Sequence, residues 1–206
     1  MMHRYSRTFT LVASTLTMLL CSACSSLDMP QQSAATQVAA LSPRIYQKSI
    51  QLSGKISVRY EKNGKPEQLP GSFEWDQNGS NLHITLLSPL GQTVARITQD
   101  EQRAILEQDG QAPRYAQNLN QLLQDHLGWA LPVAGMRDWL QGFTLQADGT
   151  RQALSRIDQQ LDSDGWTLRY VSWQQDVDLP KRIELSRYTT EVGNVSISIF
   201  IQAPNT

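Results

Sequence analysis

Histidine and cysteine side chains, which carry much of the acid–base and metal chemistry of proteins, are scarce in this 206-residue chain: it has three histidines and two cysteines. His83 falls on the polar face of a predicted strand, and His126 falls late in a predicted amphipathic helix. Neither belongs to a cluster with the ligand spacing that a metal site requires. We therefore predict no metal site and no cofactor.

Two acidic motifs have spacings that could carry chemistry. Asp176 and Asp178 could act as an acid and a base, but the Leu179-Pro180 step beside them is typical of a solvated loop. The sequence 162–165 (Asp-Ser-Asp-Gly) resembles the start of a calcium loop, but the later ligands and the closing glutamate are absent, which favours a hairpin turn. The chain also lacks a Gly-x-Ser-x-Gly elbow and a glycine-rich phosphate loop. We expect a protein that is not an enzyme.

The N-terminal residues predict export and lipidation. Two arginines precede the apolar run 9–20, and the small pair Ser22-Ala23 stands directly before Cys24. This pattern is that of a secretory signal peptide ending in a bacterial lipobox, so we expect cleavage before Cys24 and acylation of its thiol and its new amino group. Cleavage before Cys21 would instead place Leu20 where a small residue is needed. A plain secreted protein with a free Cys24 is the alternative.

The remaining composition predicts one tethered domain. We assign 1–23 to the signal peptide, 24–43 to a lipidated N-terminus and flexible tether, and 44–206 to a single β-barrel domain. Ser25 to Pro43 would span on the order of 25 Å as flexible coil. An aspartate after the lipidated cysteine usually signals inner-membrane retention, and Ser25 in its place favours the outer membrane. The net charge after cleavage, −3, and the absence of a basic cluster argue against nucleic acid as a partner.

Period-two alternation from Ser49 onward predicts about ten or eleven strands, punctuated by Asn-Gly, Asp-Gly and Gly-Asn turns. After the first meander, the expected strands are 143–146, 153–157, 166–173, 182–188 and 194–202.

Two helices interrupt the strands. Leu119, Leu122, Leu123 and Leu127 have helical spacing behind an Asn118 cap, and a second helix is expected to begin near Pro132. Helices inside a β protein must lie across the sheet. The fold class is therefore mainly β: a single half-open antiparallel β-barrel with short α-helices as a lid. Such a cover either encloses a hydrophobic cavity or rests on a core filled by side chains.

The stretch Leu82 to Thr98 holds an unusual turn. Leu82, Ile84 and Leu86 alternate toward one face, and Ser88-Pro89-Leu90-Gly91 then forms a turn with a large aliphatic residue inside it. Leu90 either folds back onto the core or is presented to something apolar outside the protein, such as a bilayer.

Several of these motifs, in this order, resemble the LolB family of outer-membrane lipoproteins over essentially the whole mature chain. They are the lipobox and the segments 54–58 (Gly-Lys-Ile-Ser-Val), 71–75 (Gly-Ser-Phe-Glu-Trp), 88–91 and 131–142. Met136 departs from the pattern, because leucine is commoner there. The resemblance implies a protein that accepts acylated lipoproteins from the periplasmic carrier LolA and inserts them into the outer membrane without nucleotide hydrolysis.

The resemblance also implies roles for individual residues. Pro89, Leu90 and Gly91 would form a membrane-insertion loop, and Cys24 would anchor the chain in the inner, periplasm-facing leaflet of the outer membrane of a Gram-negative bacterium. We expect an acyl-chain cavity lined by strand residues Phe73, Trp75, Ile84 and Leu86 and covered by lid residues Val133, Met136 and Leu140.

The expected partners are LolA, triacylated lipoprotein cargo and outer-membrane phospholipid, and we expect a monomer. Three other functions stay open. They are a structural lipoprotein subunit of an outer-membrane assembly machine with a filled core, a soluble carrier like LolA, and a hydrolase. Cys24 argues against the soluble carrier, and the missing nucleophile–base pair argues against the hydrolase.

Overall fold

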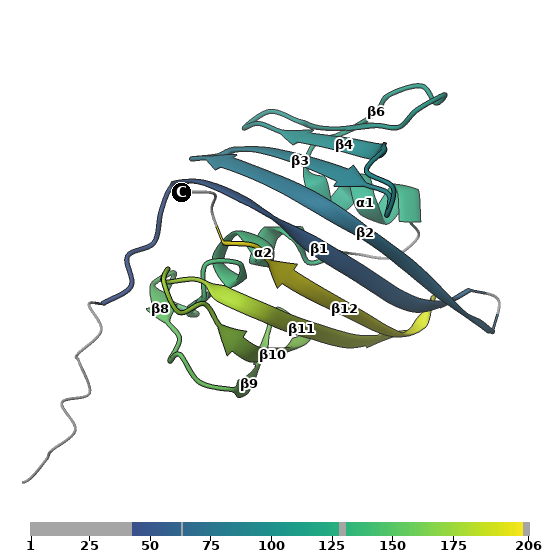
Figure 1. Cartoon of the computed structure of the whole chain (residues 1–206). Helices are drawn as coiled ribbons and strands as arrows, with labels where there is room; N and C mark the ends of the chain where they lie inside the picture. Colours follow the sequence, from purple (N-terminus) through teal and green to yellow (C-terminus); the bar gives the residue numbers. More distant parts are fainter. Residues whose placement is uncertain (1–42, 63, 128–130, 204–206) are drawn as a thin grey trace, which may run out of the picture. The chain divides into compact units, whose positions relative to one another are not determined.

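The computed structural model describes residues 43–62, 64–127 and 131–203, which belong to one compact unit, Ser42–Thr206. In these residues a ten-stranded antiparallel sheet is accompanied by a two-stranded sheet and two short helices (Figure 1). The elements are β1 (Ser49–Lys62), β2 (Lys65–Asn78), β3 (Asn81–Leu87), β4 (Thr93–Gln99), β5 (Ala104–Glu107), β6 (Arg114–Ala116), α1 (Leu119–Leu127), α2 (Val133–Trp139), β7 (Phe143–Leu145), β8 (Arg151–Ala153), β9 (Gln159–Ser163), β10 (Trp166–Trp173), β11 (Pro180–Thr189) and β12 (Gly193–Ile201).

The large sheet is a meander whose two halves meet at β1 and β12. Its order is β6-β5-β4-β3-β2-β1-β12-β11-β10-β9, so the first and last strands of the chain lie side by side at its centre. Ile56 faces Ile199 and Val58 faces Ile197 across this central pair. Because β6 and β9 do not pair with each other, the sheet stays open, and the predicted half-open barrel is confirmed.

Alternation determines which side of each strand is buried. In β12, Val195, Ile197 and Ile199 are buried, whereas Ser196 lies on the opposite, exposed face.

The predicted hairpin at 164–165 is confirmed, since Asp164 and Gly165 have φ values of 50° and 74°, as a tight two-residue turn requires. No helix in the described residues is long and apolar enough to span a membrane.

Both predicted helices form, and their apolar faces join the core on the concave side of the sheet (Figure 1). The amide of Gln121 donates a hydrogen bond of 2.9 Å to Oδ1 of Asn118, the predicted cap of α1. Pro132 is the N-cap of α2, as expected.

Three strand predictions need correction. Two strands were missed, β9 and the short strand β6, whose three residues are too few to show a period. The strand expected at 153–157 is wrong: β8 ends at Ala153 and the next strand begins at Gln159. Carbonyl groups between these two strands accept hydrogen bonds from distant side chains instead of from a neighbouring strand. The Leu154 carbonyl accepts from Arg44, and the Ile157 carbonyl accepts from Trp173.

The meander gives the sheet two distinct ends. The turns β1–β2, β3–β4, β5–β6, β9–β10 and β11–β12 lie at one end, which we call the loop end. The turns β2–β3, β4–β5 and β10–β11 lie at the other, together with residues 43–48 that lead into β1, and we call this the N-terminal end. Leu90 therefore lies at the end opposite to the one where the chain enters the sheet.

Candidate functional site

All seven residues predicted to line or cover a cavity come together in the interior. On neighbouring strands, Phe73 faces Leu86 and Trp75 faces Ile84. Leu86 is partly buried and packs against the same apolar cluster, and the other six belong to that cluster as buried members. The buried members are Phe73, Trp75, Ile84, Val133, Met136 and Leu140.

These side chains are shielded from solvent and belong to one apolar cluster in the part of the chain that the structure describes. An acyl chain from outside can reach this covered cluster only when a covering element moves away from it.

Hydrogen bonds hold helix α2 to the sheet at two places, the β2–β3 turn and β10. Arg137 donates to the carbonyls of Gly79 and Ser80 in the β2–β3 turn, at 3.0 and 2.8 Å. The hydroxyl of Tyr170 donates to the Trp139 carbonyl at 3.0 Å, and burial raises the pKa of Tyr170, so the donor keeps its proton. The Trp139 side chain is buried in the core.

The residues that follow α2 are fastened as well. The side chain of Gln141 exchanges two hydrogen bonds with the backbone of Gln47, at 2.9 and 3.1 Å. Within the helix, a Cβ on Gly135 would lie 2.4 Å from the Trp139 ring, so only glycine lets this ring fold back along α2. The helix predicted as a lid is therefore held at the N-terminal end.

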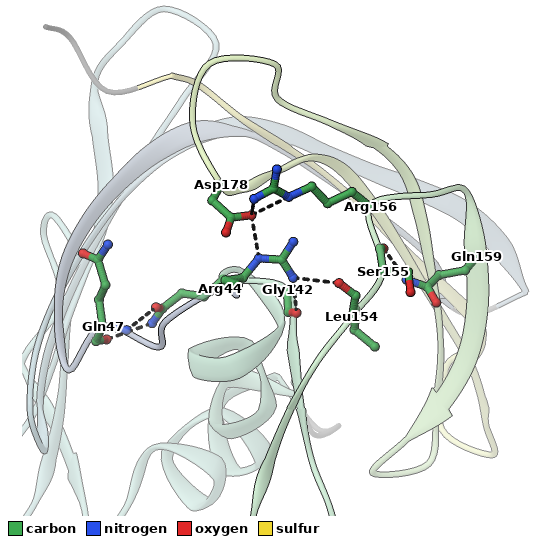
Figure 2. A network of polar contacts seen from close by, with 9 residues as sticks. Arg44, Gln47, Gly142, Leu154, Ser155, Arg156, Gln159 and Asp178 are labelled. Atoms are coloured by element: carbon green, nitrogen blue, oxygen red, sulfur yellow. Dashed lines mark hydrogen bonds and ion pairs between the residues drawn. The ribbon is translucent and has the colours of Figure 1, made fainter. Parts of the chain in front are cut away.

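Arg44 is the centre of the polar network at this end (Figure 2). Its side chain is only 6% exposed, and its Nε lies 2.9 Å from Oδ1 of Asp178. Nη1 donates to the carbonyls of Gly142 and Leu154, both at 2.9 Å. The guanidinium also stacks 4.3 Å above the centre of the Trp173 ring. One side chain thus joins the segment before β1 to the turn after α2 and to the β10–β11 loop.

Sequence reasoning missed this network. Asp178 lies in a loop and stays partly exposed, as expected, but it also binds both Arg44 and Arg156, which the sequence did not predict. Arg44 and Asp178 are 134 residues apart, and no local pattern marks an ion pair over such a separation. Burial by itself would raise the pKa of Asp178, but hydrogen bonds and charge from Arg156 and Arg44 outweigh it and hold that pKa below its ordinary value.

This pKa predicts how acid affects the fold. A carboxyl whose pKa is lower in the folded state contributes stability above its unfolded pKa, about 3.9, and that stability is lost as the pH falls through the folded value. We expect Asp178→Asn to have a lower free energy of unfolding than the wild type near neutral pH. This difference should narrow below about pH 4. Urea unfolding of both proteins from about pH 7 to about pH 3 checks this. A gap that is independent of pH would contradict it.

The β3–β4 loop presents Leu90 to solvent. The Ser88 amide donates to the Gln92 carbonyl at 2.8 Å, and the Gly91 amide donates to the Ser88 carbonyl at 2.9 Å. Gly91 has a φ of 81°, which favours glycine at this position. The Leu90 side chain is 88% exposed, so it does not fold back onto the core.

The remaining predicted residues lie apart from the apolar interior and from the β3–β4 loop. His83 is exposed on the outer face, where its ring Nδ1 lies 3.4 Å from Oγ1 of Thr98. Cys24 lies outside the described residues, and the side chain of His126 is not described. Among the described residues, no group of three or more potential ligands is placed to hold a metal ion.

A groove of about 540 Å³ also lies on the sheet, but most of its lining side chains are polar and belong to the outer face. Two members of the apolar cluster, Leu52 and Trp75, also contribute to this groove. Its lining is Gln51, Leu52, Ser53, Glu74, Trp75, Asp76, His83, Thr85 and Gln202.

Comparisons with known proteins agree on one family. The family model described as outer membrane lipoprotein LolB matches residues 48–203. An outer-membrane lipoprotein LolB from Cupriavidus necator is 40% identical over 185 residues, covering 88% of each chain. Another from Cupriavidus taiwanensis is 40% identical over 161 residues, covering 73% of this chain and 77% of its own.

Among solved structures, a LolA superfamily protein from Nitrosomonas europaea superposes with a TM-score of 0.42 at 13% identity, covering 78% of this chain and 86% of that one. A similarity at this level carries no argument about function.

Proposed function

The chain belongs to the LolB family of outer-membrane lipoproteins, and on this premise we propose that it accepts triacylated lipoproteins from the carrier LolA and inserts them into the outer membrane without nucleotide hydrolysis. In this proposal the chain is a monomer anchored through acylated Cys24 in the periplasm-facing leaflet, with 24–43 as its tether and 44–206 as its working domain. Leu90 and its neighbours Pro89 and Gly91 contact outer-membrane phospholipid.

The observation that carries the proposal is the combination of a covered apolar interior with an exposed leucine at the loop end. Each CH₂ of an acyl chain contributes about 0.8 kcal/mol when it leaves water, so a triacylated protein cannot cross the periplasm uncovered. Transfer to the bilayer therefore needs an apolar space that opens and a nearby contact with the membrane.

The covered interior has to open during loading, and we place this opening at α1. Helix α2 is held by the hydrogen bonds of Arg137, Gln141 and Tyr170. Helix α1 contacts β5 and β6, at a free edge of the ten-stranded sheet, and it also contacts α2. Separation of α1 from these three elements uncovers the interior while the hydrogen bonds of Arg137, Gln141 and Tyr170 stay in place.

A transfer assay tests the function. A purified acylated lipoprotein bound to LolA is mixed with this protein and then with phospholipid vesicles, and the cargo is followed at each step. We expect the cargo to move first to this protein and then to the vesicles, whereas LolA alone leaves it in solution. Failure of the protein to take the cargo or to pass it on would contradict the proposal.

One alternative is a structural lipoprotein subunit of an outer-membrane assembly machine. Such a protein would have a core filled by side chains and would bind partners through its surface only. Binding of a fluorescent fatty acid distinguishes the two functions, because a structural subunit would bind none. Saturable binding that the acylated lipoprotein displaces would exclude the alternative.

A further inference from the structure

Phe200 lies on the outer face of the ten-stranded sheet, away from the core. Its neighbours in β12, Ile199 and Ile201, are buried, so alternation turns Phe200 to the opposite side. The other outer-face residues near it in this strand, Ser196 and Ser198, are small and polar. Phe200 is 40% exposed, so this polar face carries one large apolar ring that the core does not use.

Three cationic side chains surround this ring. On the two neighbouring strands, Lys55 of β1 and Arg182 of β11 are the residues paired directly with Phe200. Directly paired residues of antiparallel strands project from the same face, so both side chains share the outer face with the ring. Lys181 completes the group, because its Nζ lies 5.8 Å from the centre of the Phe200 ring. We call these four residues the outer patch.

The positive charge of the outer patch is mostly not neutralised. All three cationic residues are exposed, and Arg182 donates to a carboxylate of its own strand. Neither Lys55 nor Lys181 forms an ion pair in the part of the chain that the structure describes. Glu74 of β2 lies on the same face, but it pairs in register with Ser53 and not with Lys55. The outer patch therefore combines an exposed ring with two lysines that have no acidic partner.

This combination suits the surface of an anionic phospholipid bilayer. Anionic headgroups attract lysine and arginine side chains near the surface, and an aromatic ring between them can enter the apolar boundary below the headgroups. A protein partner fits less well, because lysine is depleted in protein interfaces. A stable interface also buries about 800 Å² on each partner, which is far more than one ring supplies.

The outer patch lies toward the N-terminal end of the sheet. Phe200 stands one residue before the end of β12, and Lys181 and Arg182 follow the first residue of β11, and these strand ends both lie at the N-terminal end. Residues 43–48 lead into β1 at the same end. A lipid anchor ahead of these residues keeps this end within reach of a bilayer. Leu90 lies at the opposite end of the sheet.

We propose that the outer patch binds the anionic surface of the phospholipid bilayer and is a second membrane contact besides Leu90. The proposal rests on the proposed function in one respect, namely that the anchored chain works beside a bilayer. Because the two contacts lie at opposite ends of the sheet, they hold the domain on the membrane in different orientations. The outer patch then keeps the domain at the membrane surface while Leu90 is not inserted.

Vesicle binding tests the outer patch. The full mature chain is prepared without acyl groups, so that the anchor does not mask a weaker contact. Its sedimentation at low salt with vesicles containing phosphatidylglycerol is compared with that in phosphatidylcholine alone. We expect tighter binding to the anionic vesicles, and we expect Lys181→Glu to weaken it about tenfold. High salt should remove this difference between variant and wild type, because it screens exposed charges.

Lys65→Glu is the matched control for the charge. It makes the same change in net charge, but Lys65 lies in the exposed β1–β2 turn at the loop end. This variant should bind the anionic vesicles like the wild type. Equal binding of Lys181→Glu and Lys65→Glu, or a wild type that binds both kinds of vesicle equally, would overturn the outer patch.

The ring is tested separately. We expect Phe200→Ser to weaken binding to the anionic vesicles about threefold, because an apolar group no longer leaves water. Tyr188→Ser is its control, since this aromatic residue is 69% exposed at the loop end of β11. Urea unfolding checks that both variants are folded. Equal binding of these two folded variants would also overturn the outer patch.

The cargo transfer assay distinguishes this failure from failure of the proposed function. It follows the cargo lipoprotein from LolA to vesicles, whereas sedimentation measures the vesicle affinity of the chain itself. Transfer by a wild type that does not distinguish the two kinds of vesicle would overturn the outer patch and leave the proposed function standing. Selective vesicle binding that depends on Lys181, without any transfer of cargo, would support the outer patch and overturn the proposed function.

Discussion

Leu90→Glu is expected to leave acceptance of cargo from LolA intact and to reduce insertion into vesicles about 10- to 100-fold. The leucine side chain is 88% exposed, so its replacement removes little packing from the folded domain. Burial of one leucine side chain in a bilayer contributes about 1.5–3 kcal/mol, and each 1.4 kcal/mol is a factor of ten. A carboxylate also resists transfer into an apolar phase, which adds to the loss.

The assay separates the two steps by measuring cargo bound to the protein before vesicles are added and cargo in vesicles afterwards. Leu145→Glu is the control, because that leucine is also exposed but belongs to a different sheet. It should behave as the wild type in both steps. If Leu90→Glu lost acceptance and insertion equally, Leu90 would belong to the surface that docks LolA.

Arg44→Ala is expected to lower the free energy of unfolding by about 1–3 kcal/mol, because buried carbonyls lose a charged hydrogen-bond donor. The guanidinium is almost completely buried and contacts three acceptors at 2.9 Å: the Asp178 carboxylate and the carbonyls of Gly142 and Leu154 (Figure 2). Alanine leaves those carbonyls without this donor and removes the cation that stacks on Trp173. Asp178 keeps Arg156 as its remaining partner.

Urea unfolding near neutral pH measures this loss. Arg169→Ala is the matched control, because Arg169 pairs with Asp158 at the surface, and exposed ion pairs contribute little. Arg44→Lys should recover only part of the stability, since one ammonium group cannot reproduce the fork of a guanidinium or its stacking on an aromatic ring. A loss in Arg44→Ala as small as in Arg169→Ala would show that the network does not hold the N-terminal end together.

The two predictions concern opposite ends of the sheet. At the N-terminal end, Arg44 joins the chain before β1 to the turn after α2 and to the β10–β11 loop. At the loop end, β2 lacks its neighbour beyond Leu87, and Leu69 and Leu90 are exposed. Polar contacts thus hold one end of the sheet together, and two leucines are exposed at the other.

Local patterns were sufficient to predict most elements. Alternation predicted the buried faces of β3, β10 and β12, and the Asn118 cap predicted where α1 begins. These features depend on residues within a few positions of one another, so they can be predicted from the sequence without knowing the tertiary structure. Where the local signal was short or misleading, as at β6 and at 154–158, the prediction failed.

The sequence by itself determined the half-open β class, the faces of the strands, the turn that contains Leu90 and the resemblance to the LolB family. Only the tertiary structure decided that Leu90 is exposed, that Leu69 loses its cover where β3 ends, and that Arg44 meets Asp178. Exposure depends on which neighbours surround a side chain, and those neighbours are set by strand lengths and by pairings between residues far apart in the chain. Alternation tells which way a side chain points, but only the assembled sheet determines whether anything covers it.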